Sequence, residues 1–290
     1  MPELPEVEFA RRSLSRWLAG ATITRAHVSD ARILDEGAMA AGVARALSGR
    51  RVLRVERKGK WLRIALAAKA GARTAIVFSH LGMTGKWVAR EPGAGAVRFE
   101  KVRFEVKKAG TSARGARAVV YVDPRLFGRF VVAKEDIVAW SQLGPDPLHD
   151  GIEPNALLAR LVKRTIPVKV ALLDQRVLAG VGNIQATEAL FFARIDPRRA
   201  SKSVTPREVR ALARGIAKSI DETLAAQAGP ERSGGTNETG DDIEYVEEPG
   251  ADNPFTIYGR KGEPCPRCKK PLSKILLGGR GTVFCMRCQK

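Results

Sequence analysis

The stretch CPRCKKPLSKILLGGRGTVFCMRC, residues 265–288, decides the fold of the end of the chain. It holds all four cysteines, as two C-x2-C pairs separated by sixteen residues. Two such pairs place four thiolates tetrahedrally around one Zn²⁺ in a closed structural site. Paired disulfides or free thiols are the alternative, which we disfavour because cytosolic disulfides are rare. We therefore expect a zinc-ribbon finger ligated by Cys265, Cys268, Cys285 and Cys288, in which the zinc performs no chemistry.

A glycine-rich hairpin tip, LGGRGT at 277–282, lies between the two cysteine pairs and displays Arg280. Glycines let a backbone and a guanidinium approach a phosphate closely. The alternative is that Arg280 is an ordinary surface arginine with no role in binding. The finger therefore favours nucleic-acid binding without indicating a reaction.

The whole chain is strongly basic, with 50 Lys and Arg against 31 Asp and Glu and a net charge of +19. This charge predicts a polyanionic partner, either nucleic acid or an acidic membrane surface. No apolar run reaches the roughly 18 residues that span a bilayer. The first ten residues, MPELPEVEFA, contain no base, so we expect neither a membrane protein nor a secreted precursor.

The first half of the chain has one helical pattern followed by strand patterns. Apolar residues at helical spacing before Gly20 predict a helix with Pro5 in its first turn. Short strands then follow, which predicts an antiparallel sandwich with the helix packed outside. We expect these strands at residues 52–55, 61–66, 75–79, 97–106 and 118–122, with a bulge or tight bend inside 97–106.

The second half of the chain is helical after LGPDP at 143–147, which we interpret as an interdomain linker. Thr205-Pro206-Arg207-Glu208 is a capping box that starts one helix. Further helices are expected at 156–164, at 168–174 and from Asn183 to Ala193. Residues 229–254 lack periodicity and are acidic, so they predict a long mobile loop.

Few side chains offer a nucleophile, since the cysteines are committed to zinc and the usual serine and phosphate-loop motifs are absent. The amino terminus remains, as Pro2-Glu3. Loss of Met1 would leave a secondary amine, which attacks an aldehyde-level carbon to give an iminium ion. An α-amino group has a pKa near 7.7 to 8.0 and is partly neutral at physiological pH. An ordinary, unreactive terminus is the alternative.

Six motifs in order along the chain resemble bacterial formamidopyrimidine-DNA glycosylases, the family that also includes endonuclease VIII. They are MPELPEVE at the start, RKGKWL at 57–62, HLGM at 80–83, DPRLFG at 123–128, VGNI at 181–184 and YGRKGEPC at 258–265. The resemblance implies a multidomain α+β fold with an N-terminal antiparallel β-sandwich and flanking helix, then a helix-two-turn-helix domain ending in a zinc-ribbon finger. The expected boundaries are 1–135 for the catalytic sandwich, 136–150 for the linker, 151–228 for the helix-two-turn-helix domain, 229–254 for a flexible lesion-recognition loop and 255–290 for the finger.

The resemblance also implies a function: excision of oxidised purines, namely 8-oxoguanine and formamidopyrimidines, and strand cleavage at abasic sites. Pro2 would attack C1′ of a flipped nucleotide, and Glu3 would act as general acid and base. Lys60 would hold phosphate beside the lesion. The DNA contacts would come from His80, Asn183, Arg280 and Lys169. The protein would be a monomer on duplex DNA, in the cytoplasm and associated with the nucleoid.

The space left by a flipped base must be refilled, because flipping costs a few kcal/mol of stacking and pairing. The family's three void-filling residues correspond to Met83, Arg125 and Phe127, which could otherwise be ordinary core or turn residues. Glu188 corresponds to a helix glutamate that faces the amino terminus. Without the family, Asn183 would be read as a helix N-cap after a glycine turn.

Three departures weaken the prediction of the lesion class. Leu126 stands where a second arginine is common, and Gln185 where tyrosine is frequent. Only a partial echo, at residues 233–237, remains of the segment that covers the oxidised purine. An endonuclease VIII-type enzyme for oxidised pyrimidines is the nearest alternative, and a non-catalytic zinc-ribbon protein that binds damaged DNA is another.

If the positive charge serves to bind DNA, affinity for duplex must fall steeply with salt, because neutralised phosphates release counterions. We expect the logarithm of the association constant to fall linearly with the logarithm of salt concentration, with a slope steeper than about −2 for three or more phosphate contacts. Fluorescence anisotropy of a labelled duplex, at salt concentrations from about 50 to about 300 mM, measures this slope. A flat dependence would exclude a basic DNA-binding surface.

Overall fold

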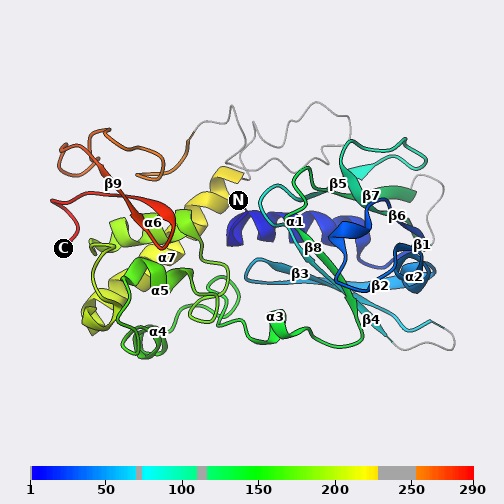
Figure 1. Cartoon of the computed structure of the whole chain (residues 1–290), viewed down its shortest axis with the longest axis horizontal. Helices are drawn as coiled ribbons and strands as arrows, with labels where there is room; N and C mark the ends of the chain where they lie inside the picture. Colours follow the sequence, from blue (N-terminus) through cyan, green and yellow to red (C-terminus); the bar gives the residue numbers. More distant parts are fainter. Residues whose placement is uncertain (1, 70–73, 110–115, 228–252) are drawn as a thin grey trace. The chain divides into compact units, whose positions relative to one another are not determined.

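A computed structural model describes residues 2–69, 74–109, 116–227 and 253–290 (Figure 1). Of the acidic stretch expected as a lesion-recognition loop, only residues 253 and 254 are among them, so its partial echo at 233–237 lies outside the described residues. The chain forms two compact units. In the described parts, the N-terminal unit comprises Pro2 and residues 6–141, and the C-terminal unit comprises Glu3–Pro5, Gln142–Gln227 and 253–290.

Within the part of the chain that the structure describes, the N-terminal unit is built on eight antiparallel strands in the order β5-β7-β6-β1-β2-β3-β4-β8. Strands β1 and β2 share only two residue pairs, so the ribbon folds there into two four-stranded layers. This is the expected antiparallel sandwich. The strands are β1 Ala21–Val28, β2 Arg50–Lys58, β3 Trp61–Leu66, β4 Ala75–His80, β5 Lys86–Arg90, β6 Glu100–Lys108, β7 Ala116–Val122 and β8 Arg129–Ala133.

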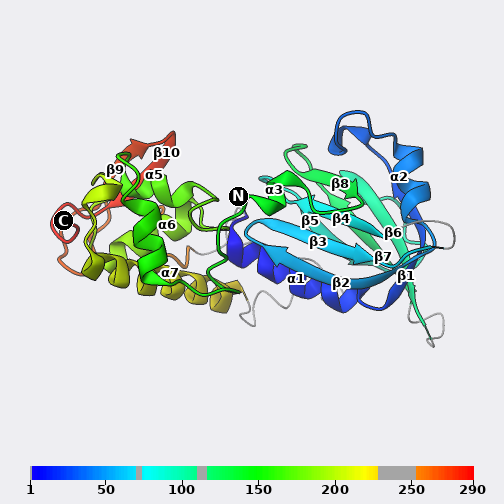
Figure 2. The same ribbon diagram turned by 90° about the horizontal axis from the view of Figure 1, so that it is seen from below.

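Helix α1, Leu4–Leu18, runs along this sheet (Figure 2). Its apolar residues Val7, Ala10, Leu14 and Leu18 are fully buried and share one core with side chains of both layers. The helical spacing read from the sequence is therefore confirmed, as is the position of Pro5 in the first turn. Helix α2, Ala40–Leu47, and the short helices η1, Ala31–Ile33, and α3, Val138–Ser141, complete the unit.

The strand expected at 97–106 begins later than predicted, at Glu100. Phe99 has a left-handed φ of 63°, and the Glu100 amide donates to the carbonyl of Val97, which closes a tight turn before the strand. A register shift follows between Glu100 and Val102. The interruption of the alternating pattern thus marks both a turn and a bulge. Residues 97–99 belong to the turn.

In its described residues, 142–227 and 253–290 with the short segment 3–5, the C-terminal unit contains five helical segments and one hairpin. Helix α7 begins after the predicted capping box: the Thr205 amide donates to Glu208 Oε2 at 2.8 Å, and the Glu208 amide donates to Thr205 Oγ1 at 3.3 Å. The LGPDP segment is tied to the same unit, since Gly144 donates to the carbonyl of Gln175. The segments are α4 Pro154–Leu161, α5 Val168–Leu173, α6 Asn183–Ala193, η3 Ser201–Ser203 and α7 Pro206–Gln227, and the hairpin strands are β9 Ser273–Leu277 and β10 Arg280–Phe284.

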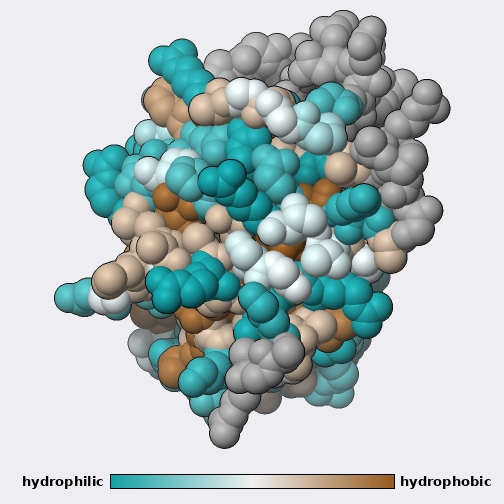
Figure 3. All heavy atoms as spheres, turned by 90° about the vertical axis from the view of Figure 1, so that its right-hand side faces the viewer, coloured by the Kyte–Doolittle hydropathy of each residue, from teal (hydrophilic) through white to brown (hydrophobic). Residues whose placement is uncertain are grey.

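The surface in Figure 3 is mostly hydrophilic, with hydrophobic side chains in small separate patches. Among the described residues, the longest helix, α7, is too polar to cross a bilayer, and no other helix meets the length and hydropathy that crossing needs. Most of the buried apolar residues instead gather in two cores, one between the layers of the N-terminal unit and one among helices α4 to α7, and smaller clusters include one between α6 and the finger.

Candidate functional site

The carboxylate of Glu3 is held at the start of helix α6. Oε1 accepts the amide of Ile184 at 2.9 Å, and Oε2 accepts the amide of Gln185 at 3.0 Å, while the residue is only 1% exposed. Helix N-terminal amides carry partial positive charge and are complementary to a carboxylate. Glu3 is thereby fixed, and Pro2 is its neighbour in the chain.

Two glycines make room for this arrangement. A Cβ on Gly182 would lie 2.3 Å from Glu3 Cδ, and one on Gly180 would lie 2.7 Å from Leu4 Cβ. The amide of Leu4 donates to the carbonyl of Gly180 at 3.1 Å, and Leu4 is fully buried in the helical core. Gly182 is the N-cap of α6. The sequence reading of Asn183 as N-cap is therefore wrong by one residue, because Asn183 is the first helical residue.

Lys169 is a fully buried lysine that joins α5 to α6 and to the finger hairpin. Its Nζ donates to Asn183 Oδ1 at 2.6 Å and to Thr282 Oγ1 at 2.5 Å. Burial lowers the pKa of Lys169 to about 8; the charge of Glu3 opposes this shift and that of Arg280 adds to it. Glu3, Lys169, Asn183 and Arg280 therefore belong to one electrostatic cluster within the C-terminal unit.

Arg280 begins strand β10 at the tip of a two-residue hairpin. The turn residues Gly278 and Gly279 have φ of 54° and 72°, the pair of positive values that a type I′ turn requires. The next carbonyl, of Gly281, accepts Asn183 Nδ2 at 3.1 Å. The hairpin is thus anchored to α6 directly behind Arg280, whose side chain is exposed.

The four cysteines converge as predicted. Their sulfur atoms all lie within 4.8 Å of one another, and the Sγ atoms of Cys268 and Cys285 are 3.5 Å apart. A tetrahedral zinc with Zn–S bonds of about 2.3 Å requires S···S separations of about 3.8 Å. The donor set therefore fits one Zn²⁺ with all positions filled by protein.

Lys60 lies in the two-residue turn between β2 and β3, after Gly59 with φ 57°. Glycine with positive φ at the first turn position is typical of a type II′ hairpin. Arg57 fixes this turn: it donates Nη1 to the carbonyl of Gly59 at 2.9 Å and Nε to Glu8 of helix α1 at 3.1 Å. Lys60 is only 9% exposed, so the alternative of a freely exposed hairpin lysine does not hold.

His80 ends strand β4 beside two cations. Burial, then the charges of Lys60 and Arg129, lower the pKa of His80 to about 4, so the ring is neutral at physiological pH. Its Nδ1 accepts the amide of Gly82 at 3.0 Å, which leaves the proton on Nε2 as a donor. His80 is therefore a neutral hydrogen-bond donor placed among positive charges that attract phosphate.

Met83, Arg125 and Phe127 lie on two loops, 81–85 and 123–128, that follow β4 and β7. Met83 is 36% exposed and Phe127 is 52% exposed, so neither is a core residue. The guanidinium of Arg125 stacks over the Phe127 ring at 4.8 Å from its centroid. Exposed apolar side chains held beside a cation match a surface that receives bases.

Sequence reasoning missed Asp123, which is completely buried and accepts hydrogen bonds from both of these loops. The signal was present, because Asp before Pro in a turn commonly bonds the backbone that follows. Two other residues named in the sequence analysis have defined partners. Glu188, expected to face the amino terminus, accepts the amides of residues 256–258, and Gln185, which stands where tyrosine is frequent in the family, is buried against Ser219 and Thr223 of α7.

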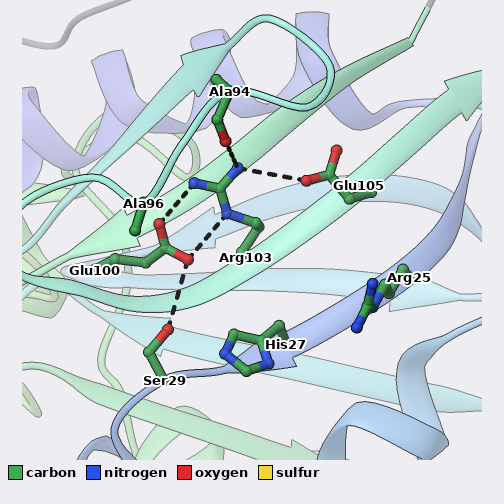
Figure 4. A pocket seen from close by; sticks show the side chains of 8 residues that line it. All are labelled: Arg25, His27, Ser29, Ala94, Ala96, Glu100, Arg103 and Glu105. Carbon is green, nitrogen blue, oxygen red and sulfur yellow. Dashed lines mark hydrogen bonds and ion pairs between the residues drawn. The ribbon is translucent and has the colours of Figure 1, made fainter.

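A pocket of about 340 Å³ lies on the sheet at β1 and β6, outside the predicted set of site residues (Figure 4). Arg103 fills one wall: it bonds both oxygens of Glu100 and the carbonyls of Ala94 and Gly95. These bonds pin the 91–97 loop to the sheet. The charges of the Arg103–Glu100 pair are mutually neutralised, so we assign this wall a structural role.

Comparison with known families covers most of the chain. Residues 1–130 match the N-terminal domain of formamidopyrimidine-DNA glycosylase, and residues 143–233 match its helix-two-turn-helix domain. Residues 262–290 match a zinc finger found in this glycosylase and in isoleucyl-tRNA synthetase.

Full-length relatives give the same result. The formamidopyrimidine-DNA glycosylase of Chloroflexus aurantiacus is 34% identical over 298 aligned residues, which cover 100% of this chain and 98% of the relative. The Lactococcus lactis enzyme bound to abasic-site DNA is 25% identical, with a TM-score of 0.81 and 99% of each chain covered. Its complex with DNA that contains a formamidopyrimidine lesion has a TM-score of 0.81 at 25% identity, covering 99% of this chain and 100% of that one.

The lowered pKa of Lys169 predicts a pH dependence of stability. Folding depresses this pKa from 10.5 to about 8, so the charged form costs stability below about pH 8 and the cost is relieved as pH rises toward 10.5. We expect the wild-type protein to gain stability relative to Lys169→Met as pH rises from about 7.5 to 9.5. Urea unfolding of both proteins at each pH measures this difference. A difference that does not change with pH would contradict the assignment.

Substitution of Gly182 tests whether the carboxylate of Glu3 is held at the start of helix α6. In Gly182→Ala the new Cβ displaces the carboxylate and leaves two helix amides unpaired, so we expect a loss of about 1–3 kcal/mol in the free energy of unfolding. Urea unfolding measures it. Gly42→Ala, where a Cβ meets nothing within 4 Å, is the matched control and should be neutral or stabilising. Equal stability of Gly182→Ala and wild type would show that Glu3 is not held there.

Proposed function

Because the chain belongs to the formamidopyrimidine-DNA glycosylase family and is therefore a DNA glycosylase for oxidised purines, we propose that Pro2 and Glu3 perform its chemistry. The observation that carries the proposal is the position of Glu3. Its buried carboxylate accepts two helix amides, and the residue is joined directly to Pro2 in the chain. A carboxylate that only supported the fold would not need to follow the terminal amine directly. The amine and a fixed proton carrier together suit iminium chemistry at a sugar carbon.

The reaction starts once Met1 is removed and the Pro2 nitrogen is a secondary amine. Its lone pair attacks C1′ of the damaged nucleotide, and the glycosidic bond breaks with its electron pair leaving on the base, which takes up a proton. Glu3 takes the proton that the Pro2 nitrogen loses after the attack and delivers it to the sugar ring oxygen, so the ring opens as the nitrogen lone pair forms the C1′–N iminium. The iminium acidifies C2′, so removal of a proton there expels the 3′ phosphate and a second elimination expels the 5′ phosphate, which cuts the strand on both sides.

Residues of both units contribute phosphate contacts in this proposal. In the N-terminal unit Lys60 supplies charge and His80 supplies a neutral donor. In the C-terminal unit Asn183 and Arg280 present donors, held in place by Lys169 and the finger hairpin. The zinc contributes structure alone, because four cysteines occupy all its positions. We expect a monomer that works on chromosomal DNA in the cytoplasm, associated with the nucleoid.

Met83, Arg125 and Phe127 are proposed to fill the space vacated by the flipped nucleotide. Their partial exposure and the stack of Arg125 on Phe127 support this role, since a flat cation and an aromatic ring substitute for lost base stacking. Leu126, between them, replaces an arginine that is common in the family, so the cationic contribution of this loop comes from Arg125.

Borohydride trapping tests the proposed nucleophile. Borohydride reduces an iminium to a stable amine, so protein with a free Pro2 should become covalently joined to a duplex that contains an abasic site. The same protein with a Gly-Ser extension before Pro2 has an amide nitrogen there and should trap at least about 100-fold more slowly. Denaturing gel electrophoresis with labelled DNA measures the adduct.

The control is binding of both proteins to a duplex with a reduced, unreactive abasic analogue, because the extended protein must still bind DNA. Absence of an adduct with the free terminus would favour a non-catalytic DNA-binding protein. Equal trapping by the extended protein would instead assign the reaction to another amine, that of Lys60, of Lys169 or of the new amino terminus.

A further inference from the structure

The structure assigns to Asp123 the role of a positioning residue that holds the three void-filling side chains in one arrangement. This inference rests on the function proposed above for Met83, Arg125 and Phe127. These residues occupy loops that are far apart in sequence, and each loop is short and exposed. A residue that bonds both loops therefore determines whether the three side chains keep one common arrangement.

The carboxylate of Asp123 bonds both loops at once. Its Oδ1 accepts the hydroxyl of Thr84 at 2.8 Å and the amide of Arg125 at 3.2 Å, and its Oδ2 accepts the amide of Gly128 at 2.8 Å. Thr84 follows Met83 directly, while Arg125 and Gly128 bracket Phe127. Asp123 is completely buried, so water does not compete for these bonds.

The same two loops touch backbone to backbone. A Cβ on Gly82, whose φ is 63°, would lie 2.3 Å from the carbonyl carbon of Phe127. A Cβ on Gly85 or Gly128 would lie 2.0 or 1.9 Å from the hydroxyl oxygen of Tyr121. The contact thus tolerates no side chain at positions 82, 85 and 128, so the two loops pack closely against each other and against Tyr121.

The hydroxyl of Tyr121 packs against both loops, beside Gly85 and Gly128. It donates to the carbonyl of His80 at 3.3 Å. Burial, with a contribution from the charge of Asp123, raises the pKa of Tyr121 well above 10, so this donor stays protonated. The backbone amide of Asp123 in turn donates to the carbonyl of Phe99, in the turn before β6.

Rigid loops matter here because the side chains they carry are exposed and partly apolar. Met83 and Phe127 would gain by folding back onto apolar surface if their loops were free. If the void-filling side chains had to become ordered each time the protein binds DNA, part of the binding free energy would be used for that ordering. Asp123 removes this requirement by fixing the loops before DNA arrives, so its effect should appear in base extrusion and be small in the later chemistry.

Asp123→Asn is the direct test. The amide keeps one acceptor oxygen and turns an NH₂ group toward an amide or hydroxyl donor, so the three bonds cannot all persist. We expect single-turnover excision of 8-oxoguanine from duplex to slow at least about tenfold. Borohydride trapping on an abasic site in single-stranded DNA, where no base pair must be opened, should stay within about threefold of wild type.

A double-mutant cycle separates positioning from simple loss of structure. If Asp123 acts through Met83, then Met83→Ala and Asp123→Asn should be strongly non-additive, and the double variant should excise about as slowly as the slower single variant. Additive effects, or an equal loss of trapping and of excision in Asp123→Asn, would overturn the inference. Thr84→Val, which removes one of the three bonds, provides a milder variant if Asp123→Asn does not fold.

The proposed function fails separately. If Met83→Ala leaves excision unchanged, the void-filling role is wrong whatever Asp123 does. If the wild-type protein forms no borohydride adduct, the catalytic proposal is wrong. The inference on Asp123 is supported only by the combination of slow excision, retained trapping and non-additivity.

Discussion

Two backbone amides at the start of helix α6 hold the carboxylate of Glu3, and the rest of the C-terminal unit is arranged around that bond. It requires glycine at 182, it sets Leu4 into the helical core, and it places negative charge near the buried Lys169. The partial positive charge of a helix terminus usually serves a ligand or a local cap. Here it receives a side chain from the far end of the sequence, and this fixes the residue that follows Pro2.

The zinc finger is too small to hold its own hairpin in place through a hydrophobic core. The cysteine cluster closes one end, and Lys169 with Asn183 bonds the other end to the helices. Glu188 adds three backbone bonds at residues 256–258, where the finger segment begins. Arg280 therefore sits at the tip of a hairpin that is secured on both sides, and its position is determined by the helices as much as by the metal.

Local patterns in the sequence predicted the elements with strong signals. The capping box at Thr205, the cysteine spacing and the helix from Asn183 to Ala193 depend on neighbours within a few residues, so they can be read directly. Strand β1 was missed because a bulge between Ile23 and Arg25 breaks its alternation, and strands β5 and β8 were also missed.

The parts of the site that depend on distant contacts could not be predicted in this way. Nothing near Asp123 in sequence shows that Thr84 donates to it, and nothing near Glu188 shows that it bonds residue 257. The family resemblance supplied roles for single residues, yet it gave no indication of the contacts that hold them.

The glycine packing around Tyr121 also determines which positions of the two loops can be substituted. Positions 82, 85 and 128 admit no side chain, whereas 83, 125 and 127 point outward and Leu126 already occupies a left-handed backbone at φ 55°. Single substitutions at 83, 125 and 127 can therefore change the exposed chemistry of the two loops while the backbone frame beneath them stays in place.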